Sequence, residues 1–144
     1  MRVERLSKWS DVVAYLKARY REVEEFAGDR LRFTADHEGT AFAIGAQLLI
    51  AGTGGSWVGF ATKLGPVTKL RERSALVANL DLPIGAFAIV MDQAVLRQTL
   101  PLHALPPTHI AHTVQALIAL TRELRHVAEL EDVDIDTPYA YVFH

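Results

Sequence analysis

The first thirty residues carry apolar side chains at helical spacing. These positions follow one another at intervals of three and four and are Trp9, Val13, Leu16, Tyr20 and Val23. Such spacing places side chains on one face of an α-helix. Ser7 or Ser10 offers a hydroxyl to cap the first turn, and Gly28 with Asp29 interrupts the pattern. The pattern predicts an amphipathic helix that ends at residues 28–29.

The next segment changes to the two-residue alternation of strands. Residues 31–36 alternate apolar and polar side chains, as a half-buried strand does. Residues 41–50 are apolar on both faces, which is typical of a central strand or of a strand at an interface. The glycine-rich residues 52–55 favour a hairpin, because glycine adopts positive φ without strain. Residues 57–64 then predict a third, returning strand.

Helical spacing returns after Gly65 and Pro66, which end that strand and predict a helix start. Its apolar positions are Val67, Leu70, Val77 and Leu80, and its other side is basic, with Lys63, Lys69, Arg71 and Arg73. Residues 85–91 and 94–100 predict a second hairpin, and Thr108 is the expected cap of a long final helix. Helices that alternate with runs of antiparallel strands predict an α+β fold in the order helix, three strands, helix, two strands, helix.

The C-terminal end differs from the rest. Residues 129–136 hold five acidic side chains and no basic one. Val133 and Ile135 alternate with aspartates, and Tyr139, Tyr141 and Phe143 continue the two-residue spacing. We therefore expect residues 132–143 to dock in extended form on a surface of the same or the partner subunit. The basic side of the second helix is a plausible neighbour. The sequence therefore predicts one domain over residues 1–130 and an acidic, aromatic tail over 131–144.

Composition narrows the function classes. The chain has 144 residues, 50% of them hydrophobic, a formal net charge of −2 and no cysteine. This balance is typical of one globular domain and argues against nucleic-acid binding by bulk charge. The absence of cysteine excludes thiol nucleophiles and disulfides. The apolar stretches are shorter than a bilayer span, and no signal-peptide pattern is present. We expect a cytoplasmic protein that neither enters membranes nor carries a cofactor.

Histidine is the remaining candidate for chemistry. His109 and His112 share a face of the final helix, and His126 is a third candidate whose place the sequence does not give. Two histidines are a weak metal signal without a third ligand. No serine lies in a nucleophile motif. A histidine-dependent enzyme or metal site is the third hypothesis. The preferred interpretation has no catalytic residue and no metal ligand.

Two apolar segments carry a family resemblance. Residues 80–89 read Leu-Asp-Leu-Pro-Ile-Gly-Ala-Phe-Ala-Ile, residues 95–102 read Val-Leu-Arg-Gln-Thr-Leu-Pro-Leu, and a long helix follows. This pattern resembles the type III secretion chaperone-like superfamily, which includes the CesT-type effector chaperones and the YbjN-type proteins. The resemblance covers residues 66–128. It implies a twisted antiparallel sheet packed by helices, and usually a homodimer.

The resemblance also implies a function. The first hypothesis is that the protein is a non-enzymatic, dimeric chaperone that binds a partner polypeptide, such as a secreted effector. The alternative is a YbjN-like regulatory or stress-related protein. The expected partner-binding groove comprises Trp9, Val13, Leu16, Tyr20, Phe33, Phe42, Ile44 and Trp57. The expected dimer interface comprises Leu70, Val77, Leu80, Ile84, Phe87 and Ile89.

Overall fold

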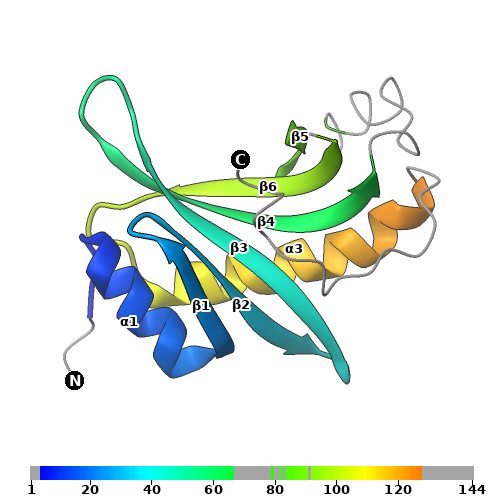
Figure 1. Cartoon of the computed structure of the whole chain (residues 1–144), viewed down its shortest axis with the longest axis horizontal. Helices are drawn as coiled ribbons and strands as arrows, with labels where there is room; N and C mark the ends of the chain where they lie inside the picture. Colours follow the sequence, from blue (N-terminus) through cyan, green and yellow to red (C-terminus); the bar gives the residue numbers. More distant parts are fainter. Residues whose placement is uncertain (1–3, 67–78, 80–81, 83, 91, 128–144) are drawn as a thin grey trace.

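A six-stranded antiparallel sheet is packed on one face by a long helix (Figure 1). This computed structural model describes residues 4–66, 79, 82, 84–90 and 92–127. The strand order in the sheet is β1-β2-β3-β4-β6-β5, and every neighbouring pair is antiparallel. The elements are α1 (Trp9–Arg19), β1 (Arg21–Ala27), β2 (Arg30–His37), β3 (Thr40–Ile50), β4 (Ser56–Pro66), β5 (Ala86–Val90), β6 (Gln93–Pro101) and α3 (Pro107–Val127). The predicted α+β class is confirmed.

The main core lies between the sheet and α3. Alternate residues of the central strands point towards the helix, because successive strand side chains face opposite sides. Phe33, Ile44 and Phe60 are at most 1% exposed. Apolar residues of α3 at helical spacing complete this layer; they are Ile110, Val114, Leu117 and Ile118. α3 therefore holds the sheet together across several strands, and it contacts β4, β6 and β2.

The predicted first helix is too long, and one strand was missed. α1 ends at Arg19, and residues 21–27 form β1, which pairs with β2 through a turn at Gly28 and Asp29. β1 is an exposed edge strand with an irregular register, and only Val23 in it is half-buried. Charged side chains are common on such edges. Here they resemble the solvated face of a helix, so the pairing with β2 decides the structure.

Smaller differences concern the element ends. β4 continues through Pro66, so Lys63 lies on this strand and not on the basic face of a helix. Its side chain is buried, with 8% of the residue exposed. The final helix begins at Pro107, one residue before the predicted cap Thr108. At the start of α1 the carboxylate of Asp11 accepts hydrogen bonds from the backbone N–H groups of Ser7 and Lys8, at 3.3 and 3.2 Å. This arrangement takes the place of the predicted serine cap.

Several predictions lie outside the described residues. They concern the helix over residues 67–78 with Leu70, Val77 and its basic side, together with Leu80. The acidic tail over residues 131–144 is also outside, so its docking stays a prediction, as does the domain boundary at residue 130.

A buried pair of threonines joins α3 to β4. The Thr62 and Thr121 hydroxyl oxygens are 2.6 Å apart, and the Thr121 hydroxyl donates to the Leu117 carbonyl at 2.6 Å. Each hydroxyl has one proton, so Thr62 donates to Thr121. Both residues are at most 2% exposed. The two threonines therefore have different roles, since the Thr62 hydroxyl depends on Thr121 as its acceptor while the Thr121 hydroxyl donates to Leu117.

Thr121→Val should destabilise the protein more than Thr62→Val. The first change leaves the buried Thr62 hydroxyl without its acceptor, at a cost of about 1–3 kcal/mol. The second leaves Thr121 bonded to Leu117, and we expect a loss of about 1 kcal/mol. Denaturant unfolding of both variants measures the difference. Equal losses would contradict this donor assignment.

Candidate functional site

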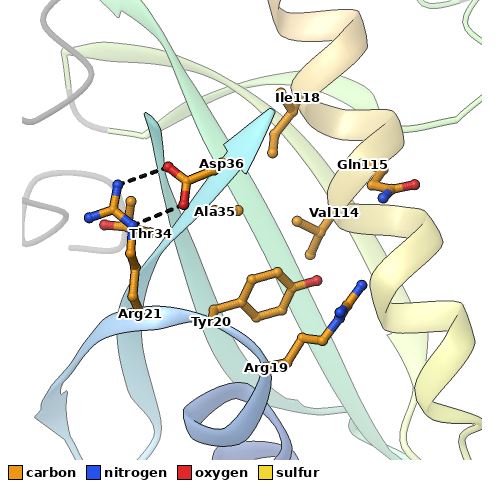
Figure 2. Close-up of a pocket in the computed structure, with 9 residues that line it drawn as sticks. All are labelled: Arg19, Tyr20, Arg21, Thr34, Ala35, Asp36, Val114, Gln115 and Ile118. Carbon is orange, nitrogen blue, oxygen red and sulfur yellow. Dashed lines mark hydrogen bonds and ion pairs between the residues drawn. The ribbon is translucent and has the colours of Figure 1, made fainter. Parts of the chain in front are cut away.

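A cleft of about 390 Å³ opens where α1 ends beside β2 and α3 (Figure 2). Its walls come from four elements or their ends: Arg19, Tyr20, Arg21, Thr34, Ala35, Asp36, Val114, Gln115 and Ile118. Ala35, Val114 and Ile118 are at most 4% exposed and form an apolar floor. Arg19 and Gln115 are exposed on opposite rims. This volume is within the usual range of small-ligand sites.

The cleft exists because β1 is shorter than β2. Arg21, the first residue of β1, pairs with Thr34, so residues 35–37 of β2 extend beyond β1. Within the described part of the chain no strand pairs with that outer edge. α1 stops there as well, since Tyr20 leaves the helix in an extended conformation while its N–H still donates to the Leu16 carbonyl. The end of α1 thus lies beside an unpaired piece of strand edge.

One of the two arginines at the cleft is already neutralised. Arg21 donates from Nε and Nη2 to the two Asp36 carboxylate oxygens, at 2.9 and 2.8 Å. Figure 2 shows this paired geometry. The hydrogen bonds from Arg21 lower the pKa of Asp36, so this carboxylate stays ionised. Arg21 also contacts Glu22 at 3.0 Å. The positive charge of Arg21 is therefore neutralised by acidic side chains of the same subunit.

Arg19 is in a different situation. Its guanidinium carbon lies 5.9 Å from the centre of the Tyr20 ring, and no acidic side chain among the described residues pairs with it. The Tyr20 ring packs on Phe33 with centroids 4.7 Å apart. Burial raises the pKa of Tyr20 to about 12, and the nearby Arg19 only partly opposes this. Tyr20 therefore keeps its proton at neutral pH and presents a hydroxyl beside a guanidinium that pairs with no acidic side chain of the described residues.

Tyr20 also predicts an alkaline limit to stability. Its folded pKa of about 12 lies above the ordinary value of 10, so the unfolded chain loses this proton first. The stabilising difference is fully present below pH 10 and is lost as the pH rises towards 12. We expect Tyr20→Phe to remove this part of the pH dependence. Denaturant midpoints at pH 8 to 12 test it; parallel curves for both proteins would contradict it.

The eight predicted groove residues do not lie on one surface. Leu16, Phe33, Phe42 and Ile44 are at most 3% exposed and belong to the main core, because α3 and α1 cover that face of the sheet. Trp9, Val13 and Tyr20 are partly buried against the same core, and Trp57 is 39% exposed. The four buried residues are thus removed from the surface a partner can contact in this structure.

The largest exposed apolar side chains lie elsewhere. Ile50 is 70% exposed and Trp57 39%, at the two strand ends of the β3–β4 hairpin, which projects beyond the sheet in Figure 1. Phe26 is 41% exposed on β1, whose turn to β2 lies beside the hairpin base, where the Leu48 N–H donates to the Asp29 carbonyl. Trp57 pairs with Leu49 and Ile50 pairs with Ser56, so Trp57 and Ile50 point to opposite faces of the hairpin. We refer to Phe26, Ile50 and Trp57 together as the hairpin surface. The sequence singled out Trp57 alone.

The described part of the predicted dimer interface lies on and next to β5, at the edge of the sheet opposite β1. Ile84 and Phe87 are half-buried, and Phe87 packs against the main core. Ile89 is 51% exposed on the edge strand β5. This placement leaves Ile89 accessible to a second copy of the chain.

The three candidate histidines lie on α3. His109 and His112 are exposed on the first turns of α3. Within the described residues no three histidine or acidic side chains come together as metal ligands would. In the same part of the chain, no helix has the length and apolar content that a membrane crossing requires.

Comparison with solved structures identifies the architecture. The chain aligns with a chain in the solved structure of the HopA1–SchA chaperone–effector complex at a TM-score of 0.58. The two chains share a fold. The alignment covers 83% of this chain and 98% of the other, at 11% sequence identity. No protein-family model and no curated protein matches. The chaperone-like fold implied by residues 66–128 is thus confirmed, while the likeness itself reaches no further than the fold.

Proposed function

We propose that this protein is a chaperone-like module that binds a partner polypeptide in extended form and catalyses no reaction on it. The observation that supports this most is the shared fold with a chain of a chaperone–effector complex over 83% of the chain. The hairpin surface adds to it, because large apolar side chains are exposed on both faces of a hairpin that projects from the sheet, where an extended segment can contact them. An effector is one partner that fits this function.

Selection of linear peptides tests the proposal. A display library of unstructured segments is panned against the immobilised full chain, and the selected segments are measured by calorimetry. We expect linear segments that bind and that protect the β3–β4 hairpin from hydrogen exchange. The proposal is wrong if no selected segment binds in solution.

We also propose that the protein works as a homodimer that uses the β5 edge. Among the described residues no strand pairs with the outer edge of β5, although the Phe87 N–H on β5 donates to Asn79 Oδ1 at 2.7 Å. An edge strand is a template for pairing with another chain, and Ile89 on it is half exposed. In a two-fold interface the same residue contributes from both copies. A second copy would cover both the strand edge and this apolar side chain.

Ile89→Lys should therefore give a monomer without unfolding the subunit. A lysine on an edge strand opposes pairing with a second strand, and the two-fold axis counts it twice. Light scattering after gel filtration measures the mass, and Ile50→Lys is the matched control because Ile50 is exposed at the end of the central strand β3, which β4 and β6 separate from β5. A wild-type monomer at micromolar concentration would contradict the dimer.

A further inference from the structure

The cleft at the end of α1 has the charge of an anion site. Of its lining residues, Arg19 and Arg21 carry positive charge and Asp36 carries negative charge, which leaves a net charge of +1. Arg21 and Asp36 neutralise each other through two short hydrogen bonds. The remaining positive charge is the Arg19 guanidinium. A single positive charge balances a monoanion, whereas a doubly charged phosphate would leave one negative charge unbalanced and would be repelled more strongly by the Asp36 carboxylate.

Hydrogen-bond donors surround this charge. The Tyr20 hydroxyl stays protonated, and in Figure 2 the Tyr20 ring and the Arg19 side chain extend together towards α3. The Gln115 amide stands on the facing rim and forms no hydrogen bond within the part of the chain that is described. A guanidinium fork with added neutral donors is well suited to a planar carboxylate.

The surroundings indicate where such a carboxylate comes from. The floor of Ala35, Val114 and Ile118 is apolar, and the edge of β2 beyond Thr34 has no strand beside it among the described residues. An extended peptide can pair with a free strand edge and place alternate side chains in a pocket. The cleft therefore combines a carboxylate site with the features that a peptide segment uses.

We propose that this cleft binds a carboxylate of the partner polypeptide through Arg19, Tyr20 and Gln115. An apolar residue of the partner next to that carboxylate then contacts the apolar floor. This inference deepens the proposed function and rests on it for the source of the carboxylate, which is a glutamate or aspartate side chain or the end of a chain. The hairpin surface supplies apolar contact, and the cleft adds selectivity for acidic segments.

Three short probes separate the sources in a titration of the isotope-labelled full chain followed by two-dimensional NMR. They are acetyl-Leu-Phe with a free terminal carboxylate, acetyl-Glu-Phe-amide with a side-chain carboxylate, and the uncharged acetyl-Gln-Phe-amide. We expect one or both carboxylate probes to shift the amide signals of Tyr20, Thr34 and Gln115, and the uncharged probe to bind about tenfold more weakly. Equal binding of all three probes would overturn the inference.

Variants assign the effect to Arg19. Arg19→Gln keeps a long polar side chain but removes the charge, and it should weaken the better carboxylate probe about tenfold. Gln115→Glu introduces a competing carboxylate into the cleft and should weaken binding in the same way. The matched control is Arg5→Gln, which removes the same charge from an exposed arginine outside the cleft and should leave binding unchanged. Unaltered spectra elsewhere show that each variant is folded.

The outcomes distinguish the two proposals. Arg19-dependent binding of a carboxylate probe supports the site even if no linear polypeptide is ever selected. Selected polypeptides that bind Arg19→Gln and wild type equally well would leave the chaperone function standing and overturn the carboxylate site. Probe binding that Arg19→Gln does not weaken, or shifts confined to residues outside the cleft, would overturn it as well.

Discussion

Truncation of Phe33 to alanine is expected to cost about 3–5 kcal/mol of folding free energy. Phe33 is 1% exposed, packs in the layer between the sheet and α3, and stacks on Tyr20 at 4.7 Å. Removal of its ring leaves a cavity that neighbours on two elements cannot fill. The melting temperature should fall by on the order of 10 °C, since this is a chain of intermediate length.

Arg32→Ala is the matched control for this experiment. Arg32 is the adjacent residue, points to the other side of β2 and pairs with Glu24 at 2.9 Å. Exposed ion pairs contribute about 0–1 kcal/mol, so this variant should unfold close to the wild type. Denaturant unfolding compares the two. If Phe33→Ala kept wild-type stability and lost only partner binding, Phe33 would be a groove residue, as the sequence suggested, and its place in the core would be wrong.

Phe33 shows what the pattern in a sequence can and cannot decide. Alternation over residues 31–36 predicts correctly that Leu31, Phe33 and Ala35 face the same side. It does not say what covers that side, because a helix of the same subunit and a bound partner give the same pattern. Here α3 covers it. Five of the six strands, β2 to β6, were predictable, while the division between core and binding surface depends on tertiary packing.

The missed strand β1 has a related cause. Tyr20 and Val23 continue the helical spacing of Trp9, Val13 and Leu16, so local periodicity favours one long helix. The chain instead leaves the helix at Tyr20 and pairs with β2. Strand pairing is a non-local interaction, and a charged edge strand with one half-buried residue carries almost no alternation of its own. No local signal distinguishes the two outcomes.

The cleft also could not be predicted from the sequence. Arg19, Asp36 and Gln115 are far apart along the chain and belong to no motif. The end of α1, the mismatch in length between β1 and β2, and the passage of α3 bring them together. Arginine and tyrosine next to each other are common in any sequence. Among the residues that line the cleft, the pairing of Arg21 with Asp36 leaves Arg19 as the positive charge without an acidic partner in the described part of the protein.

Trp57→Ala is expected to weaken binding of a selected polypeptide by about 2 kcal/mol, which is about thirtyfold. Trp57 is 39% exposed beside Leu49 on the projecting hairpin, and tryptophan is the side chain most often dominant at interfaces. Ile50→Ala should act in the same direction with a smaller effect, because it removes less apolar area. Since both side chains are exposed, neither change should lower stability much.

The control for the hairpin surface is the same substitution on the edge strand β5. Ile89→Ala removes an isoleucine side chain that is 51% exposed, compared with 70% for Ile50. We expect Ile50→Ala to reduce polypeptide affinity and leave the subunit mass unchanged, and Ile89→Ala to weaken the dimer and leave the affinity per subunit unchanged. Calorimetry and light scattering measure the two effects. Equal loss of affinity at both positions would mean that apolar exposure alone governs binding, and the hairpin surface would not be a specific site.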